Sequence, residues 1–195
     1  MIPAPVEPQA VALEGQGMRL AVRPRLARGL GEVIVQADAA GLIAGVAIEV
    51  GRLWPDDRGL FTELFRFGGA DRTAAAAEPC RQVSASQSYP GVIKAMHYHR
   101  RQTDYWAVVQ GHIQVALYDL RPQSASFGRV NTLYIGEWRP WRLQIPAGVA
   151  HGYKVLGDRA ALIVYAADQF YDPADEGRLA PDDPRFNYDW ELQHK

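Results

Sequence analysis

Short apolar runs separated by turn residues dominate the chain from about residue 43 onward. The runs alternate apolar and polar positions or are rich in β-branched residues, and they recur roughly every 8 to 12 residues with Gly and Pro between them. No long segment repeats its apolar residues with the helical period of about 3.6. This pattern predicts an all-β sandwich or barrel. The main expected strands are residues 46–50, 60–65, 82–88, 105–110, 112–118, 129–135, 142–145, 153–156 and 161–166.

The chain divides into an N-terminal part with a weak strand pattern and a longer part with a regular one. Residues 1–17 are rich in Pro, Ala, Gln and Gly and predict a loose tail. Residues 32–35 form one short apolar run, which fits an edge strand or an arm exchanged with a partner subunit. We therefore separate an N-terminal extension, residues 1–40, from one β domain, residues 41–195. Within that domain, Gly111 lies between two runs and predicts a hairpin.

Composition excludes several classes of function. A formal net charge of -1 gives no global basic field for nucleic acid. No apolar run approaches the roughly 18 residues that cross a bilayer, and the N-terminus lacks the pattern of a signal peptide. Cys80 is the only cysteine, so no internal disulfide can form and a reducing compartment is expected. The sequence predicts a cytoplasmic protein with no nucleic-acid or membrane partner.

Candidate chemistry concentrates in two segments that carry three of the five histidines. His97 and His99 are two residues apart, so on a strand both would face the same side. Asp104 follows them, and His151 lies in a later Gly-rich segment. Inward-facing histidines on neighbouring strands would line a small-ligand cavity. Neutral imidazoles with one carboxylate also suit Zn, Fe, Mn or Ni, so the four residues are a candidate metal site.

The spacing of these residues resembles the two motifs of the cupin superfamily. Gly91, His97, His99, Asp104 and Gly111 follow the order and spacing of the first motif, in which the acid is usually Glu. Residues 146–151, PAGVAH, resemble the core of the second. The resemblance implies a cupin-type double-stranded β-helix, or jelly roll, with short terminal extensions.

A colinear set of segments from about residue 43 to 190 resembles the dTDP-4-dehydrorhamnose 3,5-epimerase family. Residues 56–65, DDRGLFTELF, are similar to the family's DxRG-x-F-x-E-x-F, and residues 91–98, GVIKAMHY, to its GVLRGLHY. Residues 145–153, IPAGVAHGY, resemble IPxGFAHGF, and residues 182–190, DDPRFNYDW, resemble the closing DDPxxxIDW.

This resemblance implies an isomerase that acts on a dTDP-4-keto-6-deoxysugar. A proton next to the C4 ketone, at C3, C5 or both, would be removed and returned to the opposite face. His97 matches the family's base and Tyr165 its acid. The family reading requires no cofactor and implies a homodimer. The matched substrate-binding positions are Arg58, Glu63, Gln82, Lys94, His151 and Tyr171.

Three departures from the family leave the mechanism open. Asp104 falls where the family has a lysine that would stabilise an enolate, His99 replaces Gln or a similar residue, and the family's aspartate after the closing DW segment has no counterpart expected in the residues up to Lys195. A divalent ion beside Asp104 would remove the charge conflict and polarise the ketone. Two further functions therefore stay open. One is a metal-dependent cupin enzyme, a dioxygenase or sugar-type isomerase, that uses His97, His99, Asp104 and His151. The other is a non-catalytic sugar- or nucleotide-binding cupin.

Overall fold

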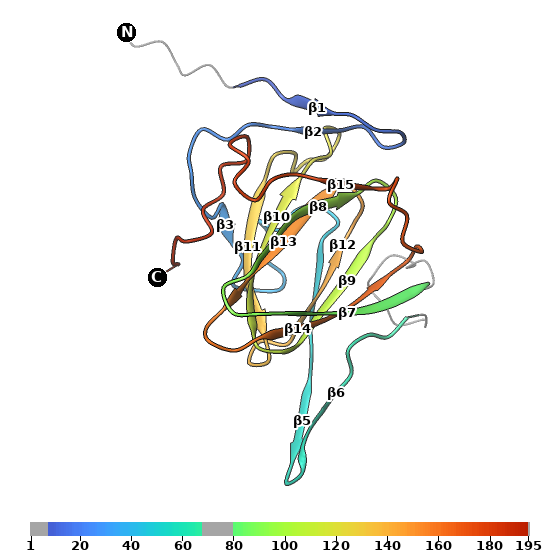
Figure 1. Cartoon of the computed structure of the whole chain (residues 1–195), viewed down its shortest axis with the longest axis vertical. Coiled ribbons are helices and arrows are strands. Elements are labelled where there is room, and N and C mark those ends of the chain that lie inside the picture. The colour runs from blue at the N-terminus through green and yellow to red at the C-terminus, as the bar shows by residue number, and fades with distance from the viewer. Residues whose placement is uncertain (1–7, 68–79, 195) are drawn as a thin grey trace.

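The structure, a computed structural model, describes residues 8–67 and 80–194, and these residues fold into two facing β-sheets (Figure 1). One sheet has six strands in the order β15-β8-β13-β10-β11-β3, and the other has five in the order β4-β12-β9-β14-β7. The described residues contain no helix, and therefore none that is long and apolar enough to cross a membrane. The all-β jelly-roll prediction is confirmed. The strands of the two sheets are β3 (Glu32–Val33), β4 (Ala47–Val50), β7 (Gln82–Ser88), β8 (Ile93–His99), β9 (Asp104–Gln110), β10 (His112–Asp119), β11 (Val130–Gly136), β12 (Trp141–Ile145), β13 (Val149–Leu156), β14 (Ala161–Ala167) and β15 (Glu176–Arg178).

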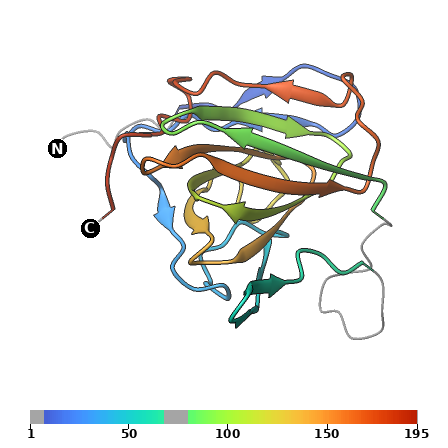
Figure 2. The ribbon, with the colours of Figure 1, turned by 60° about the horizontal axis from the view of Figure 1, so that its bottom comes forward.

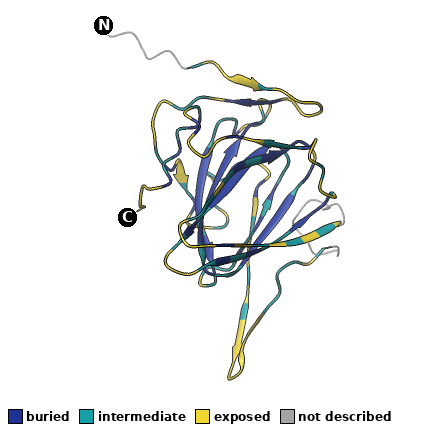
Figure 3. Cartoon of the chain, viewed as in Figure 1, coloured by how far each residue is buried: buried dark blue, intermediate teal, exposed yellow. Residues whose placement is uncertain are grey.

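The main core lies between the two sheets because alternate residues of each strand point inward. Ile113, Val115 and Leu117 on β10 are fully buried there, and Leu143 and Ile145 on β12 reach them from the facing sheet. Figure 3 shows that burial is concentrated in these central strands and decreases toward the periphery. The alternating apolar and polar residues of the sequence therefore correspond to side chains that face the core and side chains that face the cavity or solvent.

The hairpin predicted at Gly111 is wrong. β9 belongs to the five-stranded sheet, where it pairs with β12 and β14, whereas β10 pairs with β11 and β13 in the other sheet. Gly111 has a φ of 73°, a left-handed conformation that glycine adopts without a Cβ clash, and the chain crosses there from one sheet to the other. Local turn chemistry at Gly111 is the same for a hairpin and for a crossing, so the sequence could not separate them.

The N-terminal extension packs against the outer face of the six-stranded sheet. β1 (Val11–Leu13) and β2 (Leu20–Val22) form a small antiparallel sheet, and Leu20 and Val22 are buried in a second apolar cluster with Met96 and Tyr98 of β8. β3 pairs in parallel with β11 of the same chain. Residues 8–17 are thus part of the fold rather than loose, residues 1–7 lie outside the described part, and exchange of a strand between subunits stays a prediction.

A separate hairpin projects away from both sheets (Figures 1 and 2). It consists of β5 (Leu53–Asp56) and β6 (Gly59–Thr62), with Asp57 and Arg58 at its tip. The strand predicted over residues 60–65 is shorter than expected, because β6 ends at Thr62. Apolar side chains on the hairpin are exposed, including Leu60 at 60% and Phe61 at 67%.

Candidate active site

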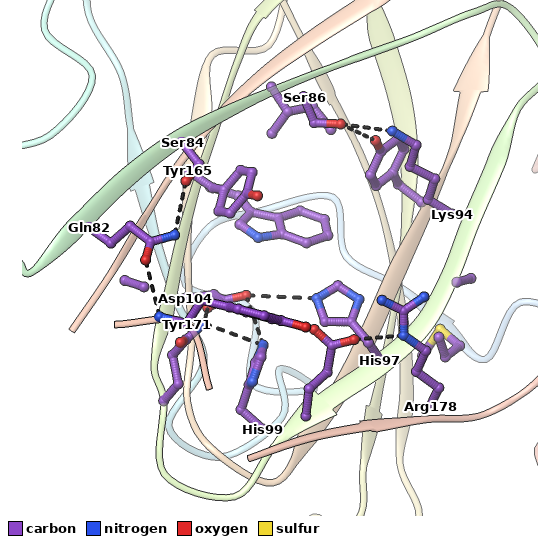
Figure 4. A pocket seen from close by; sticks show the side chains of 18 of the residues that line it. Gln82, Ser84, Ser86, Lys94, His97, His99, Asp104, Tyr165, Tyr171 and Arg178 are labelled. Atoms are coloured by element: carbon purple, nitrogen blue, oxygen red, sulfur yellow. Dashed lines mark hydrogen bonds and ion pairs between the residues drawn. The ribbon is translucent and has the colours of Figure 1, made fainter. Parts of the chain in front are cut away.

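A cavity of about 620 Å³ opens between the two sheets, lined along β8 and by alternate residues of β14. Alternate residues of β7, Gln82, Ser84 and Ser86, line one side because their side chains share one face of that strand. β8 and β9 supply the opposite side and the base. Figure 4 shows the side chains converging on this space. The remaining lining residues used below are Lys94, His97, His99, Gln102, Asp104, Trp106, Tyr165, Tyr171, Glu176 and Arg178.

Four side chains from three strands meet at the base of the cavity. His97 of β8 pairs in register with His151 of β13, and His99 follows His97 on the same face. Asp104 reaches them from β9, in the other sheet. Asp104 Oδ2 lies 3.1 Å from His151 Nε2, 3.8 Å from His99 Nε2 and 3.9 Å from His97 Nε2. We call these four residues the His–Asp cluster. The prediction that His97 and His99 face the same side is confirmed.

Burial and the contacts among the four side chains together set the charge of the cluster. Burial alone would raise the pKa of Asp104, but the hydrogen bond to His151 and the neighbouring imidazoles hold that pKa below its usual value. Burial lowers the pKa of His97 to about 4, with a further contribution from His151 that the Asp104 carboxylate opposes. Burial also lowers the pKa of His99. At neutral pH the carboxylate is therefore ionised, and the rings of His97 and His99 are neutral.

Neighbouring polar groups fix the orientation of the cluster. His151 Nδ1 lies 2.9 Å from the carbonyl oxygen of Val149. The Gln102 amide donates to Asp104 Oδ1 at 2.6 Å and lies 3.3 Å from His99 Nε2. On its other side, His99 Nδ1 faces Asp175 Oδ2 at 3.7 Å. Two of the three imidazoles thus have a polar group that sets which ring nitrogen points into the cluster.

The rest of the cavity separates a neutral polar side from a cationic one (Figure 4). Gln82 hydrogen-bonds Ser84 and accepts from the backbone N–H of Tyr171. Across the cavity, Lys94 Nζ donates to Ser86 Oγ at 2.8 Å, and Arg178 is paired with Glu176. Tyr165 comes from β14, in the sheet opposite to that of His97. A ligand in this space would therefore have His97 on one wall and Tyr165 on the other.

Most of the predicted site residues come together here. Gln82, Lys94, His97, Tyr165 and Tyr171 line the cavity together with His99 and Asp104, and His151 lies directly behind them with 2% exposure. Arg58 and Glu63 do not line it. The Arg58 side chain is 82% exposed and pairs with Asp56 at the hairpin tip, and Glu63 pairs with Arg66.

Sequence reasoning missed several groups that touch the site. Glu176 and Arg178 lie on β15, in a segment that reads only as polar and Pro-rich, and they reach the cavity because β15 pairs with β8. Gln102 contacts Asp104 and His99 from only two and three positions away, but its backbone N–H is held by Asp175, which lies 73 positions further along the chain. The only local signal was the position of Gln102 between His99 and Asp104.

Fold and cavity together define a cupin-type jelly roll with a ligand site between its sheets. The family model described as dTDP-4-dehydrorhamnose 3,5-epimerase matches residues 41–195. The chain belongs to this family.

Individual relatives agree with that assignment. The spore coat polysaccharide biosynthesis protein SpsL of Bacillus subtilis is 42% identical over 156 residues, which cover 79% of this chain and 100% of SpsL. The probable low-salt glycan biosynthesis epimerase Agl13 of Haloferax volcanii is 35% identical over 135 residues, covering 69% of this chain and 81% of Agl13. A crystal structure of a dTDP-6-deoxy-D-glucose-3,5-epimerase from Legionella pneumophila, in complex with dTDP-4-keto-L-rhamnose, has a TM-score of 0.69 and 27% identity, covering 78% of this chain and 82% of that one.

Proposed function

We propose that this protein is a nucleotide-sugar epimerase that acts on a dTDP-4-keto-6-deoxysugar and inverts C3, C5 or both. One observation carries the proposal beyond family membership. His97 and Tyr165 reach the same open cavity from opposite sheets, so a sugar ring between them would have a proton-transfer group on each face. The family model and the ligand-bound relatives support this class of substrate.

The chemistry follows from the acidity of hydrogens next to a ketone. Neutral His97 takes the proton from the carbon beside C4, and the C–H electron pair moves into the ring to form an enolate on the C4 oxygen. The hydroxyl of Tyr165 then gives a proton to the opposite face of the same carbon, which restores the ketone with inverted configuration. His97 afterwards releases its proton to solvent, and Tyr165 regains one.

Asp104 gives the imidazolium formed at His97 a negative neighbour 3.9 Å away. In the apo cavity the neutral form of His97 is favoured, because burial lowers its pKa to about 4. Once His97 has taken a proton, the nearby carboxylate stabilises the positive ring electrostatically. We propose that Asp104 in this way stabilises the protonated form of the base.

Two cationic side chains suit the diphosphate of the substrate. Lys94 and Arg178 lie together on one side of the cavity, and phosphate oxygens bind ammonium and guanidinium groups by charge-assisted hydrogen bonds (Figure 4). The Gln82 and Tyr171 side, which has neutral donors and an aromatic ring, suits the nucleoside. These roles combine the family match with the charge distribution of the cavity.

We propose that the protein works as a homodimer. Arg58 and Glu63 match substrate-binding positions of the family, yet both lie outside the cavity of their own chain. The hairpin that carries Arg58 projects from the body and exposes Trp54, Leu60 and Phe61. A second copy that receives this hairpin would cover its apolar side chains and bring Arg58 to a cavity.

We also propose a cytoplasmic location, because the single cysteine, Cys80, is a free thiol and the chain has no second cysteine for a disulfide.

Solvent exchange tests the proposed reaction directly. The protein is incubated in D₂O with dTDP-4-keto-L-rhamnose, and deuterium at C3 and C5 is followed by NMR. We expect exchange at one or both carbons that His97→Asn removes and His194→Asn leaves unchanged, since His194 is an exposed residue near the C-terminus. Saturable dTDP binding without exchange would overturn the catalytic proposal and favour a binding protein.

A further inference from the structure

We propose that the His–Asp cluster binds one divalent transition metal ion through His97, His99, Asp104 and His151. One potential ligand atom of each residue lies within 4.8 Å of those of the other three. Metal bonds of about 2.0–2.2 Å place neighbouring ligand atoms roughly 3.0–3.5 Å apart in octahedral or tetrahedral geometry. The 3.1, 3.8 and 3.9 Å distances from Asp104 Oδ2 to the three Nε2 atoms require only small adjustments to reach that spacing.

The direction of the lone pairs supports a cation at the centre. The Nδ1–H of His151 can donate to the Val149 carbonyl at 2.9 Å, and in a neutral ring this leaves Nε2 as an acceptor. That nitrogen faces another acceptor, Asp104 Oδ2, at 3.1 Å. A neutral His151 has one N–H for these two acceptors: with the proton on Nε2 it forms the hydrogen bond to Asp104 described above, and with the proton on Nδ1 a metal ion can lie between Nε2 and Oδ2. A metal ion satisfies both, together with the two further imidazoles that face the same oxygen.

His99 has a similar arrangement. Its Nδ1 is buried and, within the described part of the chain, makes no hydrogen bond, although it faces Asp175 Oδ2 at 3.7 Å. Its Nε2 points to the centre of the cluster and can accept from Gln102. A carboxylate or carbonyl behind a histidine is the common arrangement around protein-bound metals, because it orients the ring and raises its basicity. His99 and His151 each have such a group.

The cluster also has the charge and access that a metal site needs. An ionised carboxylate with 2% exposure is costly to bury without a compensating cation. Among the described residues, no Lys or Arg nitrogen lies within ion-pair distance of Asp104, and its ion-pair partners are the three histidines. His97, His99 and Asp104 line the open cavity, so an ion can reach them from solvent. Three imidazoles and a carboxylate fit Zn, Fe, Mn or Ni better than Mg or Ca.

A His97 side chain that coordinates a metal ion cannot also act as the catalytic base. This consequence rests on the proposed function. Coordination uses the Nε2 lone pair that would otherwise accept the substrate proton. Exchange that depends on His97 therefore belongs to the metal-free protein, and the metal-loaded protein should lose it.

The test measures metal first and activity second. Full-length protein is stripped with a chelator, dialysed against ZnCl₂ or CoCl₂ and analysed for metal content, and the visible spectrum of the Co²⁺ form is recorded. We expect about one ion per chain, and at least about tenfold weaker binding in His99→Asn and Asp104→Asn. His194→Asn is the matched histidine control and should bind as the wild type does. Circular dichroism confirms that each variant is folded.

The outcomes separate this proposal from the proposed function. No stoichiometric metal in the folded wild type, or equal binding by Asp104→Asn, overturns the metal site whatever the exchange assay shows. Stoichiometric binding that both variants lose supports it, even if the stripped protein exchanges no deuterium and the proposed reaction fails. Where the stripped protein does exchange, one equivalent of Zn²⁺ should reduce the rate at least tenfold, and a chelator should restore it.

Discussion

The His–Asp cluster and the β5–β6 hairpin carry parts of the same family pattern in opposite environments. In the cluster, Asp104 and His151 are each 2% exposed, and their partners come from the same chain. On the hairpin, the Arg58 side chain is 82% exposed and Phe61 is 67% exposed. Both segments match the family, but only the cluster is enclosed by residues of its own chain, whereas the hairpin is exposed.

This difference separates two kinds of site residue. A buried polar cluster costs free energy unless its members satisfy one another, so the protomer must build it completely. An exposed apolar hairpin with a cation at its tip has no such internal constraint. Its residues can contribute to a binding site once the surface of a second protomer covers them. The comparison predicts that a substitution in the cluster inactivates the site of the same protomer. A substitution on the hairpin should instead impair the site of the partner protomer.

The largest expected effect comes from His97→Asn. Loss of the base should reduce deuterium exchange into the keto-sugar by about 100-fold to 10,000-fold, because positioned acid–base groups contribute that much. Affinity for dTDP should change little, since His97 faces the sugar rather than the cationic side of the cavity. Isothermal titration with dTDP and NMR exchange rates measure the two effects separately. A large loss of dTDP affinity with normal exchange would contradict the assignment.

Arg58→Ala tests whether the hairpin works in trans. Loss of a charge-assisted contact to the diphosphate should raise KM about tenfold to 100-fold. Co-expression with His97→Asn gives mixed dimers in which one of the two sites has both residues intact. Random pairing then predicts recovery of about a quarter of wild-type activity. Recovery no greater than the sum of the two variants would mean that Arg58 acts within its own chain or not at all.

A double substitution on the hairpin tests the dimer itself. Leu60→Asp with Phe61→Asp places two charges on a surface that the proposed interface buries, so the dimer should weaken at least about tenfold. Sedimentation at several concentrations gives the association constant. Leu26→Asp, at a leucine that is 67% exposed elsewhere, is the control and should leave the association unchanged. The metal-binding residues are untouched, so metal content should remain normal.

The effect that matters least near neutral pH is a change of stability with pH in the cluster. In the folded protein the pKa of His97 is lowered to about 4 and that of His99 is also lowered, so between about pH 6.5 and 4 the unfolded chain binds more protons. Stability should therefore fall as pH drops through this window, by up to about 3 kcal/mol for His97. The lowered pKa of Asp104 acts in the same direction at lower pH.

Urea unfolding at pH 7.5, 6.0 and 4.5 measures this dependence. His97→Gln removes one of the titrating groups and should flatten the curve relative to wild type. An equal slope in both proteins would show that His97 titrates alike in the folded and unfolded states.

Local pattern was sufficient for most of the fold and for the centre of the site. The two-residue period placed His97 and His99 on one face, and alternation along residues 82–88 predicted the strand that the structure shows as β7. Turn residues marked where strands end. These features depend on neighbours within a few positions, which is the information that a single sequence contains.

Long-range pairing was beyond the sequence for a physical reason. Whether the chain turns back or crosses at Gly111 is decided by which strands offer free backbone groups to β9 and β10. Arg178 reaches the cavity only because β15 joins the edge of β8. The isolated hairpin position of Arg58 likewise depends on where β5 and β6 leave the sheet. Each of these outcomes is fixed by contacts between residues far apart in the chain.

β8 also links the N-terminal extension to the site. Its inward residues, His97 and His99, belong to the site, while its outward residues, Met96 and Tyr98, pack under Leu20 and Val22 of β2. Arg100, directly after β8, donates to the carbonyl oxygens of Leu13 and Glu14. Deleting the extension would uncover apolar surface on the strand that presents the histidines. Removal of the extension should therefore reduce the stability of the strand on which the histidines lie, unless the outer face of β8 is changed as well.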